Sequence, residues 1–182
     1  MSFYTNCDVN IHGGSSNIIS GDQIIYTPSH GSSSGFERLE KQVAANALHN
    51  SGEVSARPNC HPGTRIAILD YLIAWATALT YPHPIIWLHG PAGTGKSAIQ
   101  RTVAQLLYEK KLLLASFFFF RTAVGRNSAY NFIATISYQL ALSIPATRPH
   151  IGQAVEMNPI IFSLSLWDQA QALVLSPILV GS

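Results

Sequence analysis

The sequence predicts an α/β fold with a partial parallel sheet, arranged in three layers as in Rossmann-like proteins. Residues 85–89 form a short apolar run rich in β-formers. The glycine-rich segment 90–97 follows, and apolar residues then recur at helical spacing up to Tyr108. Residues 112–120 are apolar at almost every position, which suits a strand buried on both faces. Strand, loop, helix and strand in this order predict a parallel sheet covered by helices.

The segment 90–97 reads GPAGTGKS and fits the phosphate-loop pattern G-x-x-x-x-G-K-[ST] at every fixed position. Glycines let successive N–H groups turn toward phosphate oxygens, and the following helix directs its positive dipole at the same anion. The lysine can reach the β- and γ-phosphates, and the serine hydroxyl can bind Mg²⁺. The alternative interpretation is a strand-to-helix turn without a ligand. The predicted binding residues are Gly90, Pro91, Ala92, Gly93, Thr94, Gly95, Lys96, Ser97 and Ala98, with Ser97 as the Mg²⁺ ligand.

Three regions are expected along the chain. Residues 1–35 are rich in Gly, Ser and Asn, which predicts a flexible leader. The alternative to a disordered arm is a small module of short β-segments. Residues 36–59 are expected to hold a helix over 36–48 and a polar linker. Residues 60–182 are expected to form the main domain. Its further helices are predicted from an apolar stripe at 66–79, an apolar face within 127–140, the segment 147–157, and a capping box beginning at Ser165.

Composition excludes several classes of protein. Hydrophobic residues make up 47% and charged residues 11%, against about 25% charged in typical domains, so part of the surface is expected to be covered. The net charge is +2 with no basic stripe, which argues against nucleic-acid binding. The longest apolar run, 112–120, is far shorter than the ~20 residues of a membrane span. Two cysteines and no signal peptide indicate a reduced, cytoplasmic protein, with Cys60-His61 as turn residues rather than half of a metal site.

Several segments taken together resemble the NACHT-type, nephrocystin-like nucleotide-binding domain of fungal NOD-like receptors. They are CHPGTR at 60–65, the apolar run 85–88, the glycine-rich loop, the segment 117–121 and ATISYQL at 134–140. The likeness spans roughly residues 36–180. It implies a P-loop ATPase of the signal-transduction (STAND) class that switches between ADP- and ATP-bound states, with protein partners reached through an N-terminal arm or C-terminal repeats.

The resemblance also assigns residues outside the loop. It implies that Thr64 and Arg65 lie beside the nucleotide base and that Arg121 lies near the phosphates. From the residues alone, Arg65 is equally a helix-start residue paired with a carboxylate, and Arg121 a solvated loop cation.

One departure from the family is large. The acids after Lys96 are Glu109, Glu156 and Asp168, and none follows an apolar strand-like run, so the Walker B carboxylates that hold Mg²⁺ and position water are missing. The chain is therefore expected to be a fragment that binds ATP or ADP with little hydrolysis. The alternative is a degenerate adaptor that acts through its N-terminal arm and has a vestigial nucleotide site. A small nucleotide kinase is disfavoured by the same missing acids and by the absence of a lid.

Overall fold

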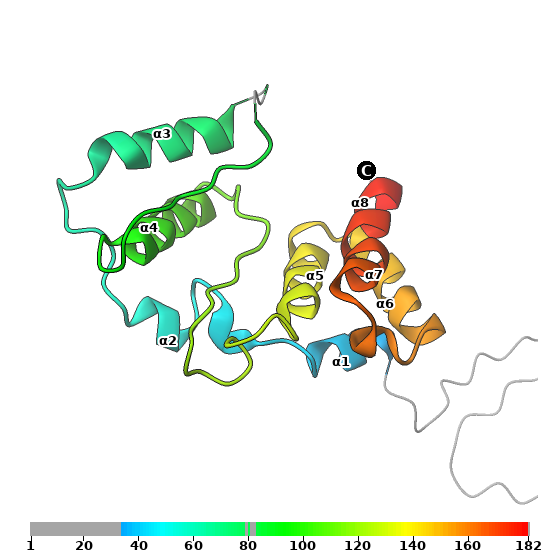
Figure 1. Ribbon diagram of the computed structural model, residues 1–182. Helices are drawn as coiled ribbons and strands as arrows, with labels where there is room; N and C mark the ends of the chain where they lie inside the picture. The colour runs from blue at the N-terminus through cyan, green and yellow to red at the C-terminus, as the bar shows by residue number, and fades with distance from the viewer. Residues whose placement is uncertain (1–33, 79, 81–82, 182) are drawn as a thin grey trace, which may run out of the picture. The chain divides into compact units, whose positions relative to one another are not determined.

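The structure is a computed structural model that describes residues 34–78, 80 and 83–181 (Figure 1). Helices make up its regular secondary structure, and they are short. In chain order they are α1 (Gly35–Glu40), η1 (Ala45–Ala47), α2 (Gly52–Ser55), α3 (Ile66–Thr77), α4 (Lys96–Glu109), α5 (Phe132–Ser143), α6 (Thr147–Met157), η2 (Ile161–Ser163), α7 (Leu166–Ala170), the π-helical η3 (Gln171–Leu175) and α8 (Ser176–Gly181).

The predicted parallel sheet is wrong, because the described residues contain no β-strand. The two predicted strands, residues 85–89 and 112–120, are extended but do not pair with each other. Ile85 and Trp87 are 78% and 84% exposed, so the first segment is not a buried strand. The second segment takes its backbone partners elsewhere: the N–H of Phe118 donates to the carbonyl of Ala47 at 2.8 Å, and that of Phe120 donates to Arg126 at 2.9 Å. A strand needs a neighbour that supplies a regular ladder of hydrogen bonds, and neither segment has one.

The main hydrophobic core joins α1 to the helices from α5 onward. Leu39 of α1 packs with Ile133 of α5, Ile151 and Val155 of α6, and Leu173 of η3, and all five are almost fully buried. The predicted helix over 147–157 is confirmed as α6. Figure 1 shows α5, α6, α7 and α8 gathered at the C-terminal end of the chain.

The helix expected over 36–48 ends early, at Glu40. Two side chains of the α5 region bind the backbone that follows. Asn131 Nδ2 donates to the carbonyl of Gln42 at 2.7 Å, and the N–H of Ala44 donates to Thr135 Oγ1 at 2.9 Å. These long-range bonds replace the i→i−4 bonds that would continue the helix, so residues 45–47 form only one 3₁₀ turn.

Helices α3 and α4 pack against each other. Their apolar faces, together with the extended segments 85–88 and 112–120, surround a hollow of about 250 Å³. The helix predicted from the apolar stripe at 66–79 is present as α3 and ends at Thr77, but none of its residues is fully buried, and Leu72 is the stripe residue that lines this hollow. Residue 79 of the stripe lies outside the described residues. Within the described residues, no helix has both the length and the apolar character needed to cross a bilayer.

Candidate functional site

The loop of residues 90–97, called the glycine loop below, owes its shape to three glycines. Gly90 has φ 150°, and Gly93 and Gly95 both have φ 82°, values that side chains with a Cβ rarely adopt. Gly95 is the N-cap residue of α4. No heavy atom lies within 4 Å of the position that a Cβ would take on Gly93 or Gly95, so the loop is open beside both. The glycines are therefore needed for the backbone path and leave free space along it.

Lys96 turns back over the glycine loop. Its Nζ donates to the carbonyl oxygens of Gly90 and Pro91, at 2.8 and 2.7 Å. An ammonium group has three donors, so one remains for a ligand. Thr94 Oγ1 donates to the carbonyl of Pro91 at 3.0 Å, which closes the turn. These bonds hold the loop around the Lys96 ammonium.

The first turn of α4 begins directly after this charge. The N–H groups of Lys96, Ser97 and Ala98 donate to no other described residue, and the first helical bond of this turn runs from Ile99 to Gly95 at 3.0 Å. Ser97 is exposed and Ala98 is half-buried. Free N–H groups at a helix N-terminus, next to an ammonium, form a site of positive potential suited to an anion.

The structure brings Arg65 to the loop but not its neighbour in the sequence. Arg65 precedes α3 with φ 61°, and its guanidinium donates to the carbonyl of Thr94 at 3.2 Å. Thr64 bonds into its own turn, through Oγ1 to the carbonyl of His61 at 2.7 Å. Arg121 is exposed and forms no hydrogen bond or ion pair with another described residue. Of the three residues assigned from the resemblance, Arg65 is the one whose side chain forms a hydrogen bond with the glycine loop in the described part of the chain.

Three arginines that the sequence did not single out line a hollow that Ser97 also lines. Arg57, Arg101 and Arg126 line a hollow of about 310 Å³, which Ser97 and Phe120 also line. Arg57 and Arg126 place their guanidinium carbons 3.7 and 5.2 Å from the centre of the Phe120 ring. They come from separate segments without a common spacing, so no motif could have indicated this cluster.

The charges of this hollow are only partly compensated. Arg126 forms an ion pair with Glu53, at 2.6 Å between Nη2 and Oε2. Burial lowers the pKa of Arg101, and the positive charge of Arg57 lowers it further, while Cys60 acts in the opposite direction. Two of the three cations thus lack a carboxylate partner among the described residues.

A metal would find few protein ligands here. The described residues contain no group of three or more His, Cys, Asp and Glu side chains placed to hold a metal ion. Ser97 is the residue expected to bind Mg²⁺, and a single hydroxyl holds that ion only together with phosphate oxygens and water.

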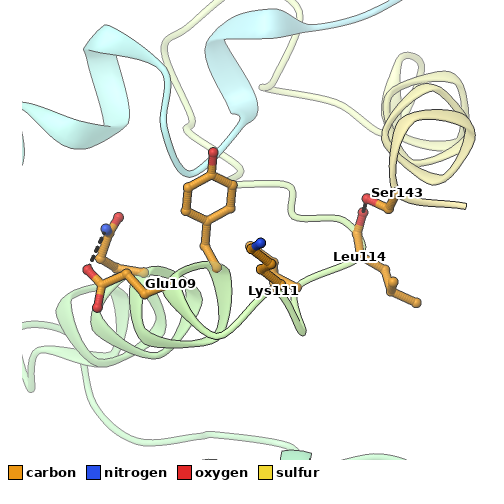
Figure 2. Close-up of a pocket in the computed structure, with 7 residues that line it drawn as sticks. Glu109, Lys111, Leu114 and Ser143 are labelled. Carbon is orange, nitrogen blue, oxygen red and sulfur yellow. Dashed lines mark hydrogen bonds between the residues drawn. The ribbon is translucent and has the colours of Figure 1, made fainter.

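A hollow of about 490 Å³ lies near the opposite end of α4 from the glycine loop (Figure 2). A helix of 14 residues spans about 21 Å, so the two places are well separated. Ser143 Oγ donates to the carbonyl of Leu114 at 2.9 Å, and Glu109 accepts a 2.8 Å bond from Gln105. Both polar groups are already engaged within the chain. We therefore place the candidate site at the glycine loop.

Comparison with known families agrees with part of the sequence interpretation. Residues 70–179 match the family described as "Nephrocystin 3, N-terminal". The chain belongs to this family. In this nephrocystin 3 N-terminal domain, the matched stretch begins within α3 and includes the glycine loop and α4. No curated protein and no solved structure matches the chain.

Proposed function

We propose that this nephrocystin 3 N-terminal domain binds ATP or ADP, with the phosphates on the glycine loop. The observation that carries the proposal is the position of the Lys96 ammonium, held over the loop by two carbonyls next to free N–H groups of α4. A polyphosphate would find one ammonium donor and several backbone donors within one turn of helix. Mg²⁺ would bind the exposed Ser97 hydroxyl together with phosphate oxygens.

The wider role is a proposal from the resemblance. We propose that the domain is a nucleotide-binding module of a NACHT-type switch of the STAND class, acting in the cytoplasm like the fungal NOD-like receptors. Arg65 supports this because it joins the start of α3 to the loop through the Thr94 carbonyl. A nucleotide that reorders the glycine loop would thereby act on α3 as well.

Calorimetric titration with Mg-ATP and Mg-ADP tests the nucleotide site. We expect Lys96→Ala to weaken binding at least tenfold, about 1.4 kcal/mol, because a charge-assisted contact contributes that much or more. Lys110→Ala is the matched control, since Lys110 is an exposed lysine just past the other end of α4.

Equal affinities of Lys96→Ala and the unchanged protein would refute the site. Absence of nucleotide binding by the unchanged protein would favour the adaptor alternative, in which the loop is vestigial.

A further inference from the structure

The hollow beside Ser97 has the features of an anion site in its own right. Arg57, Arg101 and Arg126 all line it, together with the Gln100 side chain of α4. Among the described residues, the carboxylate paired with any of the three is Glu53, whose side chain is 55% exposed. Guanidinium groups gathered in one place repel each other unless an anion lies between them. The hollow therefore carries an excess of positive charge that the described residues do not balance.

Arg126 is the strongest indication of a ligand. It is 2% exposed, which is rare for arginine, because burying a charge is costly unless it is paired and hydrogen-bonded. Its Nη2 bonds Glu53, but its Nε has no hydrogen-bond partner. The Nε of Arg101 is also buried without a partner. Two buried donors of this cluster thus have no partner among the described residues, so the cluster's polar groups are not fully satisfied by the protein itself.

The aromatic ring of Phe120 holds the cluster in place. Arg57 lies over this ring at 3.7 Å and Arg126 lies at 5.2 Å, so both guanidinium groups are positioned by one ring. Arg101 is anchored separately, through Nη2 to the carbonyl of Pro58. Such anchoring reduces the entropy that the side chains would lose on binding.

We propose that this hollow binds a phosphate-type oxyanion through Arg57, Arg101 and Arg126. Guanidinium groups match phosphate oxygens because each can offer two parallel N–H donors. The anion has two possible sources of the same chemistry: a free inorganic polyphosphate, or the phosphate chain of a nucleotide on the glycine loop. Ser97 belongs to the glycine loop and also lines the hollow. The phosphate chain of a nucleotide bound on the loop would therefore lie next to the hollow. The inference does not depend on the nucleotide proposal.

Titration with inorganic pyrophosphate at constant ionic strength tests the hollow, with binding measured by calorimetry and by the shift of the melting temperature. We expect Arg57→Gln to weaken pyrophosphate binding at least tenfold. Arg126→Lys is the second variant. It keeps the positive charge but removes the guanidinium group, which can offer two parallel N–H donors. Arg148→Gln is the matched control, because Arg148 also stacks on an aromatic ring, at 4.2 Å from Phe36, and does not line the hollow. Circular dichroism shows whether each variant is folded.

Lys96→Ala, measured in parallel, distinguishes the sources. If it keeps pyrophosphate binding that Arg57→Gln loses, the hollow is a free-standing anion site. If both variants lose binding, one anion spans the loop and the hollow, as the phosphate chain of a nucleotide would.

Two results would overturn the inference. The first is a pyrophosphate affinity that Arg57→Gln and Arg126→Lys leave unchanged while Lys96→Ala abolishes it, which would assign all binding to the glycine loop. The second is no binding of pyrophosphate by the unchanged protein. Should Arg126→Lys fail to fold, Arg57→Gln decides alone, since Arg57 is only half-buried.

Discussion

Gln139 holds the backbone of Ser116 by two hydrogen bonds. Its Oε1 accepts from the N–H of Ser116 at 3.0 Å, and its Nε2 donates to the carbonyl of the same residue at 2.9 Å. A side-chain amide thus makes the pair of bonds that a neighbouring strand would otherwise make. The extended segment 112–120 is fixed to α5 by this contact, without a sheet.

We expect Gln139→Ala to lower the free energy of unfolding by about 2–3 kcal/mol, because the two bonds to Ser116 and a third to the carbonyl of Thr135 are lost and backbone groups of Ser116 are left unpaired. Gln105→Ala is the control, since the side chain of that helical glutamine bonds Glu109, four residues later, and its loss is expected to cost less than about 0.5 kcal/mol. Urea denaturation measures both. Equal losses would show that the Gln139 contact does not stabilise the segment.

The helices were predictable where local signals decide them. Ser165 Oγ accepts from the N–H of Asp168 at 3.1 Å and begins α7, the first half of the predicted capping box, while the Asp168 carboxylate bonds the Ser165 hydroxyl in place of its backbone N–H. The helix after the glycine loop begins at Lys96, where the glycine cap places it. The strand predicted over residues 112–120 is wrong, because an apolar run does not tell whether the backbone finds a strand or a side chain as partner.

The candidate site was predictable only where it is local. The glycines and Lys96 follow one another in the chain, so their arrangement is encoded in one motif. Whether nucleotide binds there stays a prediction. The arginines of the hollow come from three separate segments and meet around Phe120 only through the tertiary fold, so no spacing in the sequence could have predicted their meeting.

The contact of α1 with α6 depends on the absence of a side chain at Gly35. A Cβ there would lie 2.0 Å from the carbonyl oxygen of Gly152 and 2.8 Å from Cγ of Glu156, which accepts a hydrogen bond from the N–H of Gly35. We expect Gly35→Ala to destabilise the protein by about 1–3 kcal/mol or more, because the backbone of α6 at Gly152 would have to move to make room for the added Cβ.

Gly52→Ala is the matched control for Gly35→Ala. Gly52 begins α2 as Gly35 begins α1, but nothing lies within 4 Å of its Cβ position. Its replacement is expected to be neutral or to stabilise by up to about 1 kcal/mol. Equal shifts of the urea unfolding midpoint in Gly35→Ala and Gly52→Ala would contradict the close contact at Gly35.

His49 makes stability depend on pH. Burial lowers the pKa of His49 below its ordinary 6.5, and its Nε2 is buried without a partner. The unfolded chain then binds a proton more readily than the folded one, so stability is fully present above pH 6.5 and falls as the pH decreases through the folded pKa. We expect His49→Gln to flatten the pH dependence of urea unfolding between pH 7 and 5, whereas exposed His89→Gln retains it. An unchanged slope in His49→Gln would assign the dependence to other groups.

We expect this chain to bind nucleotide with little turnover, because the acids that follow Lys96 are engaged elsewhere. Glu109 bonds Gln105 at the far end of α4, Glu156 accepts from the N–H of Gly35, and Asp168 accepts from the hydroxyl of Ser165. Hydrolysis at a phosphate loop needs a carboxylate for the metal and a group that orients the attacking water. Steady-state phosphate release should therefore equal that of a Lys96→Ala preparation, which controls for contaminating ATPases. Multiple turnovers that disappear in Lys96→Ala would instead show that a carboxylate of this chain reaches the loop during the reaction.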